Sequence, residues 1–195
     1  MTDWRYGLLH NIVTKTGDQG TTGTLSGDRI SKASNRLELN GNLDEVNASL
    51  GYLSSLLNKT APFNSKAEVI GDIEWIQNGL FNLGTEVSSN FLTVRFLNIQ
   101  VQRLESRIEE LTKQMPPQTK FILYSGVEAA TWTHVVRAQV RRAERSFVRL
   151  LETMQETKYP HSYQFVNRLS DYLFTLARFL NQELNGIELV TVIWD

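Results

Sequence analysis

The stretch that most constrains this chain runs from residue 131 to residue 150, TWTHVVRAQVRRAERSFVRL, and contains neither Pro nor Gly. Its apolar residues recur at steps of three and four, the spacing that places side chains on one face of an α-helix. We therefore predict one amphipathic helix. Each arginine in it is charged at any working pH and can grip phosphate or carboxylate in a bidentate fork. Five arginines, here called the arginine row, lie beside the apolar face: Arg137, Arg141, Arg142, Arg145 and Arg149.

Such a basic helix can also be a solvated surface or half of an interhelical salt-bridge lattice, because structural ion pairs are common. Two observations favour anion binding. The arginine row adjoins the apolar stripe, where a core or an interface would lie. A second segment suited to phosphate, TKTGDQGTTG at 14–23, is rich in Gly and Thr. Backbone amides and hydroxyls in such a loop can surround phosphate oxygens, although the spacing is not that of a Walker A loop.

Helical periodicity also covers most of the remaining chain. Apolar steps of three and four, with their flanking Pro, Gly and Asn residues, predict helices at about 35–58, 69–87, 101–115, 127–157 and 160–185. Short connections favour an all-α fold, an up-and-down five-helix bundle with an N-terminal Gly/Thr-rich nucleotide-binding loop. We predict a single domain over residues 1–195. Its parts are a loop segment at 1–34, the bundle at 35–185 and a β-branched tail at 186–195.

Composition excludes several classes of site and partner. The chain has no Cys, which rules out disulfides, thiolate metal sites and cysteine nucleophiles. It has no Glu-x-x-His or HExxH pattern, so no metal site made by the protein itself is predicted. The net charge of −1 does not favour nucleic acid or an anionic membrane. No apolar run approaches the roughly 20 residues that span a bilayer, and no targeting segment is evident, so we expect a cytoplasmic protein.

Six segments occur in order along residues 12–181: TKTGDQGTTG, GDRISK, LELNGNLDEVNASLGYL, FIL, HVVRAQVRRAERSFVRL and NRLSDYLFTLARFLN. Together they resemble the PduO-type ATP:cob(I)alamin adenosyltransferases, and RRAER with NRLSD and TKTGDQGTT is the most specific combination. The resemblance implies a homotrimer with active sites between subunits. It also implies transfer of the 5′-deoxyadenosyl group of ATP to cobalt(I) of a corrinoid, giving adenosylcobalamin and triphosphate. Mg²⁺ would be bound through ATP.

The resemblance further implies roles for individual residues. Asp44 and Arg137 would pair across the subunit interface beside the nucleotide and would be catalytic together with Arg141. Phe121 would lie under the corrin ring, where it helps displace the lower axial ligand. Tyr124 is not part of the family pattern, and we predict it as a second corrinoid-binding residue because its ring lies in the same loop as Phe121. The implied ATP-binding residues are Thr14, Lys15, Thr16, Gly17, Thr22, Gly23, Lys32, Arg141, Arg142, Glu144, Arg145 and Asn167.

The chain departs from the family pattern in the connection FILYSG at 121–126, where Tyr124 and Ser125 stand in place of the usual Pro and Gly. Pro would fix φ and stiffen the turn, which Tyr does not. Because this loop belongs to the corrinoid side, a second hypothesis stays open: a diverged ATP- or corrinoid-binding carrier or regulatory module without efficient transfer. A third is a helical scaffold whose arginines form only salt bridges, and such a scaffold has no use for the Gly/Thr loop.

Overall fold

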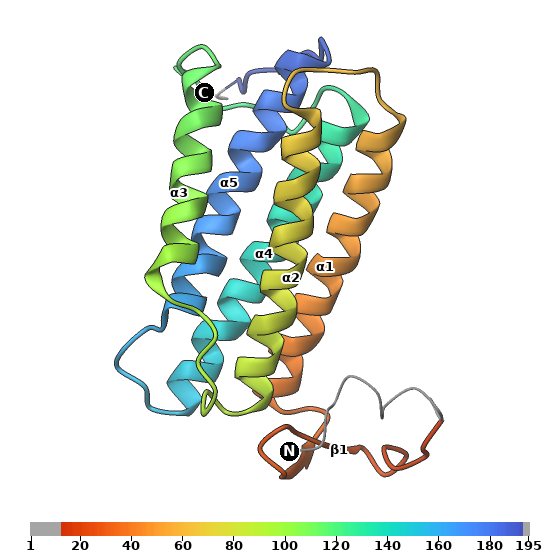
Figure 1. The fold of residues 1–195 in the computed structure, drawn as a ribbon, viewed down its shortest axis with the longest axis vertical. Helices are drawn as coiled ribbons and strands as arrows, with labels where there is room; N and C mark the ends of the chain where they lie inside the picture. The colour runs from red at the N-terminus through yellow and green to blue at the C-terminus, as the bar shows by residue number, and fades with distance from the viewer. Residues whose placement is uncertain (1–12, 193–195) are drawn as a thin grey trace.

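The computed structural model describes residues 13–192, and within that range five helices run alternately up and down along the long axis of the molecule (Figure 1). The predicted all-α, up-and-down five-helix bundle is therefore confirmed. Residues 1–12 of the predicted N-terminal segment and residues 193–195 of the predicted tail lie outside the described residues. The helices are α1 (Asn35–Lys59), α2 (Lys66–Ser88), α3 (Asn98–Lys113), α4 (Glu128–Thr153) and α5 (His161–Glu183).

The helix boundaries follow local signals in the chain. Ser34 caps α1 by accepting a hydrogen bond from the Leu37 amide, and Pro160 precedes α5. The predicted end of the fourth helix, near residue 157, is wrong. Gln155 has a φ of 58°, and the amide of Glu156 donates back to the carbonyl of Leu151 at 3.0 Å. This left-handed turn satisfies carbonyls at the helix end and stops α4 earlier than its composition indicates.

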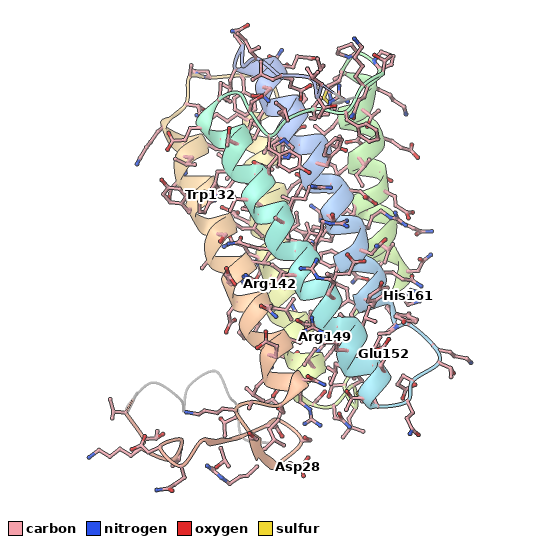
Figure 2. All side chains as sticks on the ribbon, turned by 180° about the vertical axis from the view of Figure 1, so that it is seen from behind. Asp28, Trp132, Arg142, Arg149, Glu152 and His161 are labelled. Carbon is pink, nitrogen blue, oxygen red and sulfur yellow. The ribbon has the colours of Figure 1, made fainter. Side chains whose placement is uncertain are left out.

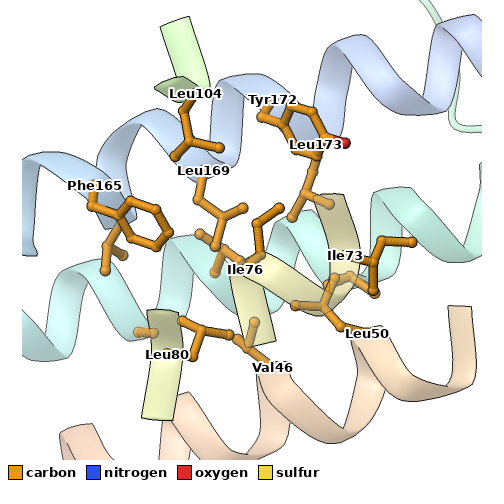
Figure 3. Packing of buried hydrophobic residues seen from close by; sticks show 14 of the residues in the cluster. Val46, Leu50, Ile73, Ile76, Leu80, Leu104, Phe165, Leu169, Tyr172 and Leu173 are labelled. Carbon is orange, nitrogen blue, oxygen red and sulfur yellow. The ribbon is translucent and has the colours of Figure 1, made fainter. Parts of the chain in front are cut away.

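The apolar stripes of the helices meet along the axis of the bundle (Figure 3). Leu50 of α1, Ile73 of α2 and Phe165 of α5 are fully buried there. Asp72 is a buried charged residue of α2, and its carboxylate accepts hydrogen bonds from Arg107 Nε at 2.7 Å and Tyr172 Oη at 3.2 Å. Burial, and next the charge of Asp72, raise the pKa of Tyr172 well above its ordinary value, so the phenol stays a neutral donor. This network ties α2, α3 and α5 together.

The Gly/Thr-rich segment folds into a small hairpin at the end of the bundle where α1 begins (Figure 1). Its strands, β1 (Thr21–Gly23) and β2 (Arg29–Ser31), are antiparallel. The sequence predicted a structured loop here without strands. The Leu25 amide donates to Ser88 Oγ at 3.1 Å, and Arg36 Nη2 donates to Asn90 Oδ1 at 2.7 Å. The first bond holds the hairpin against the end of α2, and the second joins the start of α1 to the segment that follows α2.

The opposite end of the bundle carries the connection between α3 and α4 and the C-terminal tail (Figure 1). The two segments pair in antiparallel fashion at Ile122 and Val190. The amide of Leu123 donates to the carbonyl of Leu189 at 2.7 Å. The tail is thus extended where it covers residues 121–123, in keeping with its β-branched composition. No helix of residues 13–192 has the length and apolar character needed to cross a bilayer.

Candidate functional site

The arginine row lies on the outer face of α4, as its helical spacing predicts. The stripe of Val136, Val140 and Phe147 is buried, whereas Arg141, Arg142, Arg145 and Arg149 are exposed and Arg137 is half-buried. Figure 2 looks onto this helix from behind and labels Arg142 and Arg149 along it. Four guanidinium groups are therefore accessible to a ligand or to a second protein surface.

The arginines of the row differ in their partners within the chain. Arg142 forms an ion pair with Glu45 of α1, and Gln139 Nε2 donates to the same carboxylate at 3.2 Å. Among the salt bridges between described residues, no other member of the row takes part. Arg141 and Arg145 are therefore available to an anion without breaking an ion pair, while Arg142 would have to exchange Glu45 for it.

Two expected ATP-binding residues are brought together beside the row. Asn167 Nδ2 of α5 donates to Glu144 Oε1 of α4 at 2.7 Å, and Tyr163 Oη donates to the same oxygen at 3.3 Å. Burial, and next the negative charge of Glu144, raise the pKa of Tyr163, which keeps the phenol protonated. Sequence reasoning missed Tyr163, although it precedes Asn167 by one helical turn. The three side chains form a fixed polar group on the α4–α5 surface.

The hairpin collects the other expected ATP-binding residues into a compact loop. Arg29, which sequence reasoning missed, donates to the carbonyl of Thr16 at 2.6 Å and to Thr21 Oγ1 at 2.9 Å, which closes the loop. A Cβ at Gly17 would lie 2.8 Å from Lys32 Nζ, so the ammonium rests against bare backbone. The hydroxyls of Thr14 and Thr16 are 3.0 Å apart. Lys15, Thr22 and Gly23 belong to the same loop and its first strand.

A single chain does not unite all the predicted residues in one place. Asn35 Nδ2 donates to Thr153 Oγ1 at 2.8 Å, which places the start of α1 beside the end of α4. The exposed Asp44 lines a groove of about 290 Å³ between α1 and α2, which also includes Leu25 of the hairpin. Arg137 lines a different cavity, so the predicted pair of Asp44 and Arg137 is not formed within the described chain.

That second cavity, of about 480 Å³, contains both residues predicted for the corrinoid side, Phe121 and Tyr124. Phe121 is 79% exposed, so its ring is not part of the core. Arg137 Nη1 donates to Tyr124 Oη at 3.1 Å, and its guanidinium lies 5.3 Å from the ring of Phe174. The remaining lining residues, which sequence reasoning did not assign, are Gln118, Ile122, Asp171 and Thr175.

His134 packs against Tyr124 on the side away from the cavity lining. It is 3% exposed, and its ring stacks on that of Tyr124 with centroids 4.5 Å apart. Neither ring nitrogen has a hydrogen-bond partner among the described residues. Burial, and next the charge of Arg137, lower the pKa of His134 to about 4, so the imidazole is neutral at pH 7. Its position one turn before Arg137 is the signal that could have placed it here.

Taken together, the geometry favours anions on α4, and the adjoining cavity combines aromatic rings with polar and charged side chains. Within residues 13–192 no three His, Asp or Glu side chains gather as a metal site. Most of the predicted ATP-binding residues carry guanidinium, ammonium, hydroxyl or amide groups. Such groups donate hydrogen bonds to phosphate oxygens. Guanidinium and ammonium groups are cationic and cannot ligate Mg²⁺, so these residues do not themselves form a site for that ion.

Comparison with known proteins agrees with this chemistry. The family model described as cobalamin adenosyltransferase matches residues 12–180. A cobalamin adenosyltransferase of Cupriavidus metallidurans is 37% identical over 187 residues, which cover 96% of this chain and 95% of that protein. A corrinoid adenosyltransferase of Bacillus subtilis is 35% identical over 172 residues, with 87% and 86% covered.

A solved structure resembles the bundle over almost its whole length. It is a variant PduO-type ATP:corrinoid adenosyltransferase from Lactobacillus reuteri complexed with cobalamin and ATP. The TM-score is 0.83 at 30% sequence identity, and the match covers 94% of this chain and 100% of that chain. The extent of these matches, together with the arginine row and the adjoining cavity, leads to one conclusion. This chain belongs to the cobalamin adenosyltransferase family.

Proposed function

We propose that this protein transfers the 5′-deoxyadenosyl group of ATP to cobalt(I) of a corrinoid. The observation that carries the proposal is the position of Arg137. This residue begins the arginine row of α4 and also lines the cavity of Phe121 and Tyr124. A triphosphate bound along the row and a corrin ring bound in the cavity would therefore meet at one place on the helix.

The reaction is a displacement at the ribose 5′-carbon. The electron pair of cobalt(I) forms the cobalt–carbon bond while the bond from C5′ to the phosphate oxygen breaks. Triphosphate leaves with the electron pair of that broken bond. Because cobalt(I) is itself a strong nucleophile, the protein needs no activated side chain to attack. Its task is to align the two substrates and to stabilise the departing negative charge.

Three parts of the protein would bind the nucleotide: the arginine row, the polar group on the α4–α5 surface and the hairpin. Arg141 and Arg145 hold no ion pair within the described chain and would contact phosphate directly, joined by Arg142 after it leaves Glu45. Glu144 and Asn167 would fix the nucleoside, since a carboxylate accepts from ribose hydroxyls. Mg²⁺ would be held by the phosphate oxygens and would neutralise part of their charge. The remaining proposed contacts come from the hairpin: Thr14, Lys15, Thr16, Gly17, Thr22, Gly23 and Lys32.

We also propose that the active assembly is a cytoplasmic homotrimer with sites between subunits. Support comes from the separation of the two catalytic partners within a chain. Asp44 lies in the α1–α2 groove with the hairpin, whereas Arg137 lies in the α4–α5 cavity. When the groove of one copy docks on α4 of the next, Asp44 can pair with Arg137 and the hairpin can reach the arginine row.

The direct test incubates the protein with MgATP and chemically reduced cobalamin while the adenosylcobalamin spectrum and triphosphate release are followed together. We expect both products to appear in equal amounts, and neither without ATP. Tight binding of ATP and cobalamin without product would instead support the carrier or regulatory module. Failure to bind ATP at all would leave the arginine row as a salt-bridge surface and would refute the proposal.

A further inference from the structure

One buried amide ties the last turn of α5 to the loop of the corrinoid-side cavity. Asn181 is 2% exposed, and both ends of its side chain are used. Its Oδ1 accepts a hydrogen bond from the Val127 amide at 3.0 Å, and its Nδ2 donates to the Ser125 carbonyl at 2.9 Å. Val127 directly precedes the first residue of α4. Asn181 therefore connects the end of α5 with the loop and with the start of the helix that carries the arginine row.

Two glycines make room for this amide. A Cβ at Gly126 would lie 1.9 Å from Asn181 Oδ1, and a Cβ at Gly186 would lie 2.3 Å from the same atom. Gly126 also has a φ of 112°, a conformation that other residues rarely adopt. The side chain of Asn181 thus fits only because residues 126 and 186 are glycines. A side chain at either position would clash with it.

The hydroxyl of Ser125 joins the same loop to the C-terminal tail. It donates to the carbonyl of Ile187 at 3.2 Å and accepts from the amide of Leu189 at 3.0 Å. The amide of Thr191 also donates to the carbonyl of Phe121 at 2.9 Å. Residues 121–126 are therefore fixed on two sides, by α5 through Asn181 and by the tail through Ser125.

We propose that Asn181 and Ser125 are positioning residues for the corrinoid half of the reaction. Neither lines the cavity, but both hold the backbone that carries Phe121 and Tyr124 into it. The usual Pro would stiffen this turn through its fixed φ. Here the two polar side chains supply that rigidity through hydrogen bonds to neighbouring segments. This inference rests on the proposed function, because the cavity is taken as the corrinoid site.

The test compares Asn181→Asp with the control Gln182→Glu. The first change keeps the acceptor for Val127 but removes the donor to Ser125. The neighbouring control removes one donated bond, from Gln182 Nε2 to the carbonyl of Gln114 at 2.7 Å, at the α3 end of the same connection and outside residues 121–126. We expect Asn181→Asp to raise the KM for cobalamin about fivefold, the equivalent of one lost hydrogen bond, and to leave the KM for ATP within about twofold. Gln182→Glu should change neither KM.

Ser125→Ala provides a second, milder variant in case Asn181→Asp folds poorly. Both variants should speed amide hydrogen exchange in residues 121–127 and 187–191, and Gln182→Glu should not. An equal rise of both KM values, or an unchanged cobalamin KM in both variants, would overturn the positioning role. A wild-type protein that transfers no adenosyl group would instead overturn the proposed function itself, so the two failures are distinguished.

Discussion

The arginines of α4 have different tasks at the scale of single residues, although they look equivalent in the sequence. Arg142 is paired with Glu45 and Arg137 contacts Tyr124, while Arg141 and Arg145 have no ion-pair partner among the described residues. Helical spacing predicted that Arg137, Arg141 and Arg145 lie on one face, with Arg142 and Arg149 flanking them. It could not predict the pairing of Arg142, because Glu45 lies on a helix far away in the sequence.

Arg141→Ala should therefore weaken ATP binding, because a hydrogen bond between a charged donor and phosphate is worth about 1.5–3 kcal/mol. This corresponds to a loss of roughly 10- to 150-fold in affinity, measurable by titration calorimetry with MgATP. Arg149→Ala, further along the same exposed face, serves as the control and should change the affinity much less. Indistinguishable affinities for wild type and Arg141→Ala would remove this residue from the nucleotide site.

His134 leads to a prediction about pH. Its pKa is about 4 in the folded protein and 6.5 as an ordinary value, so the unfolded chain binds more protons between these limits. The neutral imidazole therefore contributes fully to stability above about pH 6.5. This contribution is lost as the pH falls toward 4. After allowance for solvent screening, the loss between pH 7 and pH 5 should be about 1–2 kcal/mol.

Urea unfolding at both pH values measures this loss for wild type, His134→Gln and the control His161→Gln, which changes an exposed histidine. His134→Gln should flatten the pH dependence by the stated amount, because the replacement does not titrate. The control should keep the wild-type dependence. The same slope in wild type and His134→Gln would show that other groups cause the loss.

At the scale of elements, apolar periodicity predicted the five helices because it is a local property of each segment. The hairpin and the earlier end of α4 were not predicted. The end of α4 depends on the left-handed φ of Gln155, and the hairpin strands are only three residues each. Periodicity also could not predict how α3 is held, since Asp72, Arg107 and Tyr172 come from three different helices.

Asp72→Asn tests that attachment of α3. It removes the buried carboxylate partner of Arg107, whose side chain is 17% exposed, and leaves the guanidinium only the exposed carboxylates of Glu68 and Glu110. We expect the free energy of unfolding to fall by about 3 kcal/mol, the effect of breaking a buried pair by removing one member. Glu109→Gln breaks the exposed pair with Lys113 on the same helix and should cost no more than about 0.5 kcal/mol. Equal losses in denaturant unfolding would contradict a special role for the buried network.

At the scale of the whole molecule, the sequence predicted a set of site residues but not how they are distributed over the bundle. The hairpin lies at one end of the bundle, and the connection between α3 and α4, which contains Phe121 and Tyr124, lies at the other (Figure 1). α4 and α5 both run between them along the proposed site. Asp44 and Arg137 lie on different faces of the bundle because of how the helices pack. Helix packing depends on the whole folded chain and cannot be predicted from local sequence patterns.

The proposed trimer should have a mass of about three times 22.3 kDa by light scattering at micromolar concentration. Its interface should also couple Asp44 with Arg137. In a double-mutant cycle on transfer activity, Asp44→Asn and Arg137→Ala together should do less harm than the sum of the single changes. A monomeric mass would exclude a site between subunits, and additive effects would remove the pair from the mechanism.

The separation of the hairpin from the α4 face has a consequence for mixtures of defective chains. In the proposed trimer, each site takes its loop from one copy and its arginines from another. A chain altered at Lys15 and a chain altered at Arg141 would each be inactive alone. After subunit exchange, some interfaces would receive an intact loop and an intact helix, and those sites would regain activity. Two defective forms of this protein could thus complement each other within one cell.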